Sequence, residues 1–572
     1  MFTTDAARIA DYEARGWWAG TTVDAMFQQT AAAAPDALAL IDPPNRPLLD
    51  GQPQERLTWA QVRDRVERMA AALLAAGLVK DDVICVQLPN TTDAVILFLA
   101  AARLGLIISP VVMQYREHEL SHIFDLTTPK AFITVPTFHK HDHAAMAAGL
   151  LASRPGLRLL LLATSAEGTD READLRAAMA AADPAPVAAH VAANPTAGGE
   201  VLTICWTSGT ESRSKGVPRD HNHWVLNARI VAEAAGMRDG DVLLNPFPLV
   251  NIGSIGGQVM PWLLLRGRLV LHHPFDLPLF LAQAAAERVT YTIAPPAVLT
   301  ALLKQPDLMR GTDLSALRAI GSGSAPLSPW LIEGWKEQHG IEICNIFGSN
   351  EGASLFSSPG DVPDPTERAR YFPRFGAAGQ DFDSIVHRVI RTRLADPDTG
   401  EEITVPGRPG ELRITGAATF SGYWRSPHLT AAAFDDQGWY RTGDLFEIAG
   451  TGALSRFYRF VGRCKEIIVR GGVNISPAEL DELLTGLPQA REAATVGIPD
   501  PDLGERVAVA LVPRDGAEPT LADVLDWLKR ADVAVFKRPE RLVLLPVLPR
   551  NAMNKVQRDQ LRAQVLAALD AA

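Results

Sequence analysis

A loop rich in hydroxyl groups and glycine follows the apolar, strand-like run Val201 to Cys205. It reads Thr207-Ser208-Gly209-Thr210-Glu211-Ser212-Arg213-Ser214-Lys215-Gly216. Backbone N–H groups and hydroxyls donate hydrogen bonds to phosphate oxygens, and a lysine adds positive charge. The loop is not the P-loop of NTPases, because that motif has Gly before its lysine and Ser or Thr after it. By itself it is equally typical of a polyphosphate site and of a polar surface turn.

A carboxylate follows a second strand-like run. Glu351 ends the segment Asn345-Ile346-Phe347-Gly348-Ser349-Asn350-Glu351, which comes after Ile341-Glu342-Ile343. A carboxylate just past a strand end suits Mg²⁺, which binds one or two carboxylates together with substrate oxygens. Taken alone, a solvated glutamate in a loop is the commoner interpretation.

Three more segments combine charged residues with glycine or proline. They are Gly438-Trp439-Tyr440-Arg441-Thr442-Gly443-Asp444-Leu445, then Gly462-Arg463-Cys464-Lys465-Glu466-Ile467-Ile468 continuing into Gly471-Gly472-Val473-Asn474-Ile475, and Pro549-Arg550-Asn551-Ala552-Met553-Asn554-Lys555. Each alone fits a turn or a solvated lysine. Their occurrence together, in this order, favours a shared site.

Length and composition limit the class of protein. At about 150 residues per domain, 572 residues predict two to four domains. An apolar fraction of 47% and a charged fraction of 21% are those of an ordinary soluble globular protein, which argues against disorder, collagen, coiled coil and membrane bundle. The net charge of −11 gives no general attraction to phosphate backbones, so we expect no nucleic-acid partner.

The cysteines and the apolar runs indicate a cytoplasmic protein. Four cysteines lie far apart without a C-x-x-C pair, so neither a disulfide framework nor structural zinc is expected. The N-terminus lacks the basic and apolar regions of a signal peptide. The longest apolar stretch, Val95 to Met113, is interrupted by Arg103 and Ser109-Pro110, and no transmembrane segment is predicted. A homodimer is left open.

Short apolar runs alternate with helical patterns along most of the chain. The strand-like Val83 to Val86 precedes a predicted helix over Thr91 to Arg103, and a strand over Leu106 to Ile108 follows. The alternation continues at 131–134, 159–162 and 269–271. It predicts an α/β fold of βαβ units with largely parallel sheet. Residues 183–199, rich in Ala, Pro and Gly, predict a surface connection.

The last hundred residues predict a small α+β domain. Ser476-Pro477-Ala478-Glu479 has the pattern of a capping box, and Leu480, Leu483, Leu484 and Leu487 then share a helical face. Two strand-like runs and a helix capped by Thr520 follow. We place the border so that an N-terminal domain spans 1–462 and a mobile C-terminal domain spans 463–572.

Taken in order, these segments resemble the motifs of the adenylate-forming superfamily, which includes acyl-CoA synthetases, peptide-synthetase adenylation domains and beetle luciferases. The resemblance runs from Leu57-Thr58-Trp59 to Lys555. It implies a large N-terminal domain of βαβ-rich subdomains, with a small C-terminal domain that rotates. It also implies a ligase of the fatty-acid- or aryl-CoA type: a carboxylate and ATP give acyl-AMP and pyrophosphate, and coenzyme A then gives acyl-CoA and AMP.

The resemblance assigns roles to residues of the nucleotide site. In the phosphate loop these are Thr207, Ser208, Gly209, Thr210 and Lys215. The residues that the resemblance places beside the adenine and the α-phosphate are Gly323, Ser324, Ala325, Pro326, Asn345, Phe347, Gly348 and Asn350. Asp444 and Arg463 would hold the ribose hydroxyls. Lys555 would bridge the substrate carboxylate and the α-phosphate, and Glu351 would lie near Mg²⁺. Lys465 falls at the hinge, and Gly471-Gly472 falls at the pantetheine tunnel.

Several positions depart from the family pattern. Glu211, Ser212 and Ser214 replace the commoner Thr, Gly and Pro of the phosphate loop, and Glu211 is left out of the site because a carboxylate would repel phosphate. Phe347 replaces Tyr and keeps a ring for adenine. Asn350 replaces Thr and keeps a donor. Asn554 replaces Gly, and Asn tolerates left-handed backbone better than most residues.

The acyl pocket is expected between Val250–Gly257 and Gly321–Phe356, with Asn251, Ser254 and Gly323 in its wall. No acidic residue in 250–257 offers a partner to an α-ammonium group, so we predict a bulky or medium-chain apolar acid rather than an amino acid. Trp262 is expected in the core.

Three alternatives share these motifs. An acyl-AMP ligase would load a separate carrier protein, although only about seventeen residues follow Lys555 and leave no fused carrier domain. A luciferase-like oxygenase is the second. The third is a non-catalytic acyl-nucleotide binder, against which the retention of Lys555, Asp444 and Glu351 argues.

Overall fold

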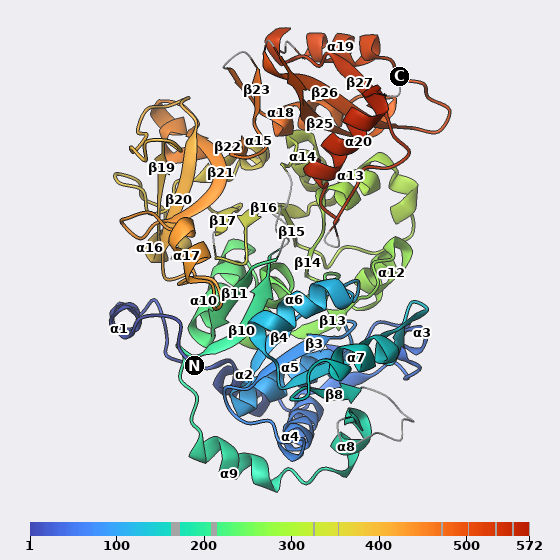
Figure 1. The fold of residues 1–572 in the computed structure, drawn as a ribbon, viewed down its shortest axis with the longest axis vertical. Helices are drawn as coiled ribbons and strands as arrows, with labels where there is room; N and C mark the ends of the chain where they lie inside the picture. Colours follow the sequence, from blue (N-terminus) through green and yellow to red (C-terminus); the bar gives the residue numbers. More distant parts are fainter. Residues whose placement is uncertain are drawn as a thin grey trace.

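The computed structural model describes residues 1–161, 172–207, 214–323, 326–352, 354–470, 473–501, 503–531, 533, 535–551 and 554–570. Figure 1 shows the chain running from the N-terminal sheets to a small C-terminal domain, in red, at the opposite end of the molecule.

An eight-stranded sheet forms one half of the large domain. Its strand order is β17 (Ser354–Ser357), β16 (Glu342–Gly348), β15 (Ala319–Gly323), β14 (Tyr291–Ile293), β12 (Val242–Asn245), β13 (Arg268–Leu271), β1 (Leu38–Ile41) and β2 (Arg56–Thr58). Antiparallel edge strands, β17 and β2, flank a parallel centre.

A seven-stranded sheet forms the other half. Its order is β11 (Gly216–Asp220), β10 (Val201–Trp206), β4 (Ile107–Pro110), β3 (Val83–Gln87), β5 (Ala131–Thr134), β8 (Arg158–Leu161) and β9 (Glu172–Asp174). All of its pairs are parallel except the β10–β11 hairpin. The prediction of an α/β fold with largely parallel sheet is therefore confirmed.

A five-stranded antiparallel sheet follows, which the sequence analysis did not anticipate. Its order is β18 (Tyr371–Pro373), β22 (Phe457–Arg463), β21 (Tyr440–Ile448), β20 (Gly410–Gly416) and β19 (Ile390–Ala395). Its aromatic core includes Phe372, Phe446 and Tyr458.

Beyond it, the small C-terminal sheet contains β24 (Val473–Ile475), β23 (Ile468–Arg470), β26 (Gly504–Pro513), β25 (Ala490–Asp500) and β27 (Arg541–Leu544). A short hairpin, β6 (Thr137–Phe138) and β7 (His141–Asp142), stands apart.

Helices of the large domain pack with its sheets in several hydrophobic cores. The helices are α1 (Ala6–Ala14), α2 (Val23–Ala33), α3 (Arg46–Asp50), α4 (Trp59–Ala75), α5 (Thr92–Leu104), α6 (Glu117–Thr127), α7 (His143–Ala152), α8 (Leu175–Ala181), α9 (Ala185–Ala193), α10 (His221–Ala234), the π-helix η1 (Ile252–Val259), α11 (Met260–Leu264), α12 (Leu277–Ala286), α13 (Pro296–Lys304), η2 (Pro306–Met309), α14 (Pro329–His339), α15 (Pro365–Arg370), α16 (Ile385–Val389), α17 (Pro427–Ala433) and η3 (Gly452–Arg456). The largest core joins both sheets to α2, α4, α5, α10 and α11. Trp262 is fully buried there, as predicted.

The C-terminal domain carries α18 (Pro477–Leu484), α19 (Leu521–Arg530), η4 (Val535–Lys537) and α20 (Arg558–Asp570). Leu480 and Leu484 are buried on one face of α18, as predicted. Within the described part of the chain, no helix is long and apolar enough to cross a membrane.

Two local predictions were wrong in part. Residues 183–199 are not connection throughout, because α9 occupies their centre. Its alanines favour helix, and a proline in the first turn costs nothing there since the first N–H groups have no intrahelical partner. At the start of α18, Ser476 caps the backbone N–H of Glu479, but the reciprocal half of the box is missing. The Glu479 carboxylate instead takes two hydrogen bonds from Lys537, both of 2.8 Å.

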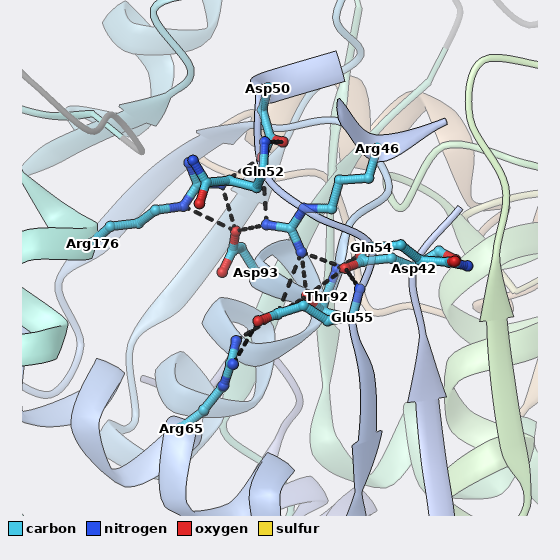
Figure 2. Close-up of polar contacts among 10 residues, drawn as sticks. All are labelled: Asp42, Arg46, Asp50, Gln52, Gln54, Glu55, Arg65, Thr92, Asp93 and Arg176. Atoms are coloured by element: carbon cyan, nitrogen blue, oxygen red, sulfur yellow. Dashed lines mark hydrogen bonds and ion pairs between the residues drawn. The ribbon is translucent and has the colours of Figure 1, made fainter. Parts of the chain in front are cut away.

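A buried ion network joins the two large sheets (Figure 2). Asp42 directly follows β1 of the eight-stranded sheet, while Asp93 lies in the first turn of α5, which connects β3 to β4 of the seven-stranded sheet. The Arg46 guanidinium, 2% exposed, binds both carboxylates. Arg176 of α8 adds a hydrogen bond of 2.7 Å to Asp93. Burial raises the pKa of Asp42 to about 6, although Arg46 acts to lower it.

Candidate functional site

The phosphate loop joins β10 to β11 as the loop of a hairpin. The two strands pair antiparallel up to Trp206 and Gly216. At the open end, the Thr207 N–H donates to the Lys215 carbonyl at 3.0 Å, and the Lys215 N–H donates to the Thr207 hydroxyl at 3.2 Å. Thr207 and Lys215 thus close the base of the loop. The predicted contacts Ser208, Gly209 and Thr210, like Glu211, lie outside the described residues.

Two neighbouring segments hold this base. From α6, a ring nitrogen of His122 lies 2.9 Å from the carbonyl oxygen of Ser214. From the loop after β20, the Trp424 N–H donates to the Gly216 carbonyl at 2.8 Å. The preceding residue, Tyr423, places its ring under the Lys215 ammonium, 5.0 Å from the nitrogen. Contacts from α6 and from the loop after β20 therefore hold the base of the phosphate loop in place.

Glu351 stands on a tight turn after β16, with 6% of its surface exposed. The Tyr423 hydroxyl donates to its Oε1 at 3.0 Å, and the Phe420 N–H donates to its backbone carbonyl at 2.9 Å. The next residue, Gly352, has a φ of 86°, and a Cβ there would lie 1.8 Å from the Ala418 carbonyl oxygen. Only glycine fits this position, so the turn that presents Glu351 depends on it.

Asn350 and Arg219 brace the same turn. The Asn350 amide donates to the Trp206 carbonyl at 3.0 Å, and its oxygen accepts from the Ile252 N–H, also at 3.0 Å. Arg219, fully buried on β11, donates to the carbonyl oxygens of Asn350 and Ala418. Burial lowers the pKa of Arg219 to about 10, so its guanidinium remains charged at neutral pH. Asn350 thereby ties the Glu351 turn to the phosphate-loop strand and to η1.

Asp444 and Arg463 form a cross-strand pair on β21 and β22. The Arg463 Nε donates to the Asp444 carboxylate at 3.0 Å. Burial raises the pKa of Asp444, whereas Asp444 raises the pKa of Arg463. The pair offers carboxylate and guanidinium groups side by side, which suits vicinal hydroxyls.

Lys555 reaches this region from the C-terminal domain. The backbone N–H of Lys555 donates a hydrogen bond to the side-chain oxygen of Asn551 at 3.0 Å. The preceding Asn554 has a φ of 62°, the left-handed backbone that asparagine tolerates better than most residues. The Lys555 side chain remains open to solvent, yet the protein around it and the nearby Arg463 lower its pKa. Asp444, Glu351 and Glu466 act on the same ammonium in the opposite direction. The charges of groups from three separate segments thus act on one lysine.

Residues predicted beside the adenine lie along β16, at the end of β15 and in the loop that follows β15. The Asn345 amide is buried and donates to the carbonyl oxygens of Arg368 and Ala369, both at 3.1 Å. Both N–H donors of the Asn345 amide are therefore occupied, and this side chain holds the backbone of Arg368 and Ala369 in place. The half-buried Phe347 ring lies 5.0 Å from that of Phe446, and the neighbouring Gly348 ends the strand. A Cβ at Gly323 would lie 2.0 Å from the Ile346 carbonyl oxygen, so this close approach requires glycine. Pro326 is exposed, and Ser324 and Ala325 lie outside the described residues.

The predicted acyl segment, Val250–Gly257, includes the first six residues of η1. The Asn251 side-chain oxygen accepts from the Ser254 N–H at 3.1 Å. Ser254 is fully buried, and its hydroxyl donates to the Asn245 side chain and the Phe247 carbonyl, both at 3.2 Å. An apolar cavity of about 30 Å³ lies between this segment and the ends of β3 and β4. Its wall consists entirely of apolar residues and proline, among them Val86, Leu88, Phe98, Val250, Ile255 and Val259.

The predicted hinge lies between two sheets. Arg463 is the last residue of β22 in the five-stranded sheet, and Ile468 is the first of β23 in the C-terminal sheet. Lys465 lies in the exposed turn between them. Arg558 of α20 holds the next residue, Glu466, through an ion pair of 2.8 Å. The tunnel residues Gly471 and Gly472 lie outside the described part of the chain.

The motif residues described above come from both domains, and comparison with known proteins identifies the pattern. The sequence model described as "AMP-binding enzyme" matches residues 27–424. The model described as "AMP-binding enzyme C-terminal domain" matches residues 479–555. The chain belongs to the AMP-binding enzyme family. The predicted resemblance is thereby confirmed, and this AMP-binding enzyme has the large N-terminal and small C-terminal domains expected of it.

Relatives of known function match over nearly their whole length. A 2-hydroxy-7-methoxy-5-methyl-1-naphthoate–CoA ligase of Streptomyces carzinostaticus is 31% identical over 97% of this chain and 95% of its own. A medium-chain fatty-acid–CoA ligase of Escherichia coli is 29% identical over 99% of this chain and 94% of its own. Among solved structures, ATP-bound MatB of Rhodopseudomonas palustris aligns with a TM-score of 0.78 and 27% identity, covering 95% of this chain and 99% of its own. The names of both ligases agree with the prediction of an enzyme that forms carbon–sulfur bonds.

Sequence reasoning missed three residues that position the site: Tyr423, Arg219 and His122. None stands in a segment with the spacing of a phosphate or metal motif. Arg219 lies within a strand that is buried throughout, where an unpaired arginine is costly, and this burial was the available signal. Tyr423 and His122 act from loop and helix positions far along the chain, which only the fold brings to Glu351 and to the phosphate loop.

Proposed function

We propose that this AMP-binding enzyme is an ATP-dependent acid–CoA ligase. In the first half-reaction a carboxylate oxygen of the acid attacks the α-phosphorus of ATP, and the bond to the bridging oxygen breaks to release pyrophosphate. In the second, the sulfur of CoA attacks the acyl carbon, the thiol loses its proton, and AMP leaves with the electron pair of the C–O bond. The product is a thioester.

The observation that carries the proposal is the place of Lys555. A cation from the C-terminal domain lies within electrostatic reach of Glu351 and of Asp444, which the large domain presents. Such an arrangement neutralises charge at a nucleotide phosphate while the Asp444–Arg463 pair holds the sugar. The chain needs no nucleophilic side chain for this chemistry, because positioning and electrostatic stabilisation account for the rate of phosphoryl-type transfer.

The chain's own groups divide the first half-reaction among them. Lys215 and the closed base of the phosphate loop hold the β- and γ-phosphates. Lys555 holds the acid's carboxylate next to the α-phosphate and offsets the negative charge that develops there. Asp444 accepts hydrogen bonds from the ribose hydroxyls. Phe347 offers its ring to the adenine, and its position against Phe446 fixes the orientation of that ring.

Glu351 suits a magnesium ion. Oε1 accepts the Tyr423 hydroxyl, and Oε2 accepts no hydrogen bond from any residue in the described ranges. One carboxylate oxygen together with phosphate oxygens is a donor set that Mg²⁺ accepts. When bound, Mg²⁺ neutralises phosphate charge. Glu351 and the ATP phosphates would hold it.

The second half-reaction calls for a different arrangement of the domains. Lys555 must leave the acyl-AMP before a thiol reaches the acyl carbon, and the exposed turn at Lys465 is the connection that such a rotation would bend. The ion pair of Arg558 with Glu466 anchors the end of this turn to the C-terminal domain. Gly471 and Gly472 would then line the thiol's approach.

The acid is proposed to be bulky and apolar, either aromatic or medium-chain. The segment 250–257 contains no charged side chain, and the residues that line the small cavity beside it are all apolar. An amino acid would bury its ammonium group without a carboxylate partner on this wall, which is costly. The naphthoate and fatty-acid ligases described above act on acids of both apolar kinds.

The test is a panel of aromatic, medium-chain and amino acids, each assayed with ATP in the presence and absence of CoA. We expect pyrophosphate release with apolar acids, and acyl-CoA with the same acids once CoA is added. Lys555→Ala should abolish most of both products, while Lys529→Ala, which removes an exposed lysine on α19 of the same domain, should leave them unchanged.

Each alternative predicts a different result. No pyrophosphate with any acid would indicate a non-catalytic binder. Pyrophosphate without thioester would indicate a carrier-protein acceptor, and light or oxygen uptake would indicate an oxygenase. The best kcat/KM with an amino acid would contradict the proposed substrate class.

A further inference from the structure

Tyr423 contacts two charged groups of the site at once. Its hydroxyl donates to Oε1 of Glu351 at 3.0 Å, and its ring lies under the Lys215 ammonium at 5.0 Å. Glu351 comes from the turn after β16, and Lys215 comes from the end of the phosphate loop. The tyrosine is 8% exposed and belongs to neither segment. Its side chain links the charged groups of the two segments.

Each contact satisfies a need of its partner. A buried carboxylate is costly unless it accepts hydrogen bonds, and within the described residues Tyr423 supplies the one side-chain donor that Glu351 has. The Lys215 ammonium forms no ion pair with a described residue, and the face of an aromatic ring attracts a cation. Without Tyr423, both side chains would be free to turn into other rotamers.

Tyr423 is itself held in place and held protonated. Its backbone N–H donates to the Thr430 hydroxyl at 2.9 Å, and the Phe420 ring packs edge-on against its ring, with the two centroids 4.9 Å apart. Burial, with Glu351 second, raises the pKa of Tyr423 far above its usual range. The phenol is therefore protonated at neutral pH and can donate its hydrogen bond to Glu351.

We propose that Tyr423 is a positioning residue for adenylation, which orients the Glu351 carboxylate and the Lys215 ammonium toward the same ATP phosphates. It touches neither substrate nor phosphate and acts through its two partners. By holding Oε1 it leaves Oε2 directed to the ligand, and by lying under Lys215 it limits how far that side chain swings. The inference rests on the proposed function of Glu351 and deepens it.

The test separates hydroxyl from ring. Tyr423→Phe removes the hydrogen bond to Glu351 and keeps the ring under Lys215, whereas Tyr423→Leu removes both. Losing a hydrogen bond to a charged group predicts about a 10-fold lower kcat for pyrophosphate exchange in Tyr423→Phe. Its KM for ATP should change little, because the Lys215 contact remains. Tyr423→Leu should lower kcat further and also raise KM for ATP several-fold.

A matched control is Tyr458→Phe. Tyr458 is a buried tyrosine of β22 whose hydroxyl donates to the Thr392 hydroxyl at 3.3 Å, away from the site. Its loss should lower the melting temperature by a few degrees and leave kcat and KM unchanged. Melting curves and the equilibrium affinity for ATP, measured for all variants, give readouts that do not depend on turnover.

A double-mutant cycle decides the mechanism. If Tyr423 acts through Glu351, the double variant Glu351→Gln/Tyr423→Phe should be no slower than Glu351→Gln alone, because interacting residues show non-additive effects. Multiplicative losses in the double variant would overturn the inference, as would a Tyr423→Phe variant that behaves like Tyr458→Phe. If Glu351→Gln by itself left pyrophosphate exchange intact, the proposed role of Glu351 would fail instead, and the two failures are thus distinct.

Discussion

Asp444 and Arg463 face each other across β21 and β22, and Nε of the guanidinium donates to the carboxylate at 3.0 Å. The Asp444 side chain is 9% exposed, whereas that of Arg463 is 47% exposed. The carboxylate is therefore held in a poorly solvated position by a partner that itself remains half in water. Burial outweighs this partner and raises the pKa of Asp444. At neutral pH the fold keeps a charge there at a cost in stability.

Asp444→Asn should stabilise the fold and weaken ATP binding. A carboxyl group whose pKa is raised on folding takes up protons with the folded state, so its contribution to stability is present at low pH and is lost as pH rises through that pKa. The amide has no charge to bury, so we expect a higher melting temperature at pH 7, with the advantage shrinking toward pH 4. Loss of an anionic acceptor for the ribose predicts about a 10-fold higher KM for ATP.

The control for this variant lies on the same strands. Glu447 and Arg459 are also a cross-strand pair of β21 and β22, with the carboxylate 7% and the guanidinium 58% exposed. Glu447→Gln should leave KM for ATP unchanged. An equal rise of KM in both variants would indicate a general disturbance of the sheet.

Local features of this site were readable from sequence because they depend on near neighbours. A left-handed asparagine before Lys555 and hydroxyl caps at Ser476 and Thr520 follow from residue type and short spacing. Tyr423 follows from neither, because it lies 72 positions along the chain from Glu351 and only tertiary structure brings the two side chains together. The same holds for Arg219, which supports Asn350 from a distant strand.

The five-stranded sheet shows a signal that was present but not used. In β19, Ile390, Thr392 and Leu394 are buried while Arg391 and Arg393 lie at least partly exposed between them. This period of two predicts a strand with one face in the core. The prediction of fold class rests instead on the helix–strand alternation of the first three hundred residues. That alternation indicates parallel sheet and gives no information about an antiparallel sheet that follows it.

Arg46→Met should destabilise the large domain severely. The substitution removes a fully buried guanidinium from between Asp42 and Asp93 and leaves uncompensated buried charge. Breaking a buried pair in this way costs about 3–5 kcal/mol. The free energy of unfolding from urea denaturation measures it. Arg15→Met, which breaks a surface pair with Asp11 whose partners are 52% and 48% exposed, should cost less than about 1 kcal/mol. Similar small losses in both would show that the buried network is not needed for stability.

Lys555→Ala should separate the two half-reactions. Acyl-AMP formation should fall by at least about 10²-fold, the scale for losing one positioned electrostatic group. Thioester formation from supplied acyl-AMP should be largely spared, because the lysine serves only the adenylation arrangement. The wild-type rate of adenylation should also fall as pH rises through the pKa of Lys555, which lies below that of an ordinary lysine. An unchanged alkaline limb in Lys555→Ala would contradict this assignment.

Lys465→Pro should produce the opposite pattern. Proline fixes φ near about −65°, so a hinge residue replaced by it cannot supply the dihedral change that rotation requires. Lys465 lies in the turn between β22 and β23, and the adjoining Glu466 is held to the C-terminal domain by Arg558. Adenylation, which uses the arrangement described here, should therefore proceed, while capture of CoA slows.

Pyrophosphate exchange and acyl-CoA release, measured separately, give the two rates. Lys465→Ala removes the same ammonium but leaves the backbone free, so it should preserve both. Equal losses of both half-reactions in Lys465→Pro would count against rotation at this turn, because a hinge defect acts only on the step that follows the rotation.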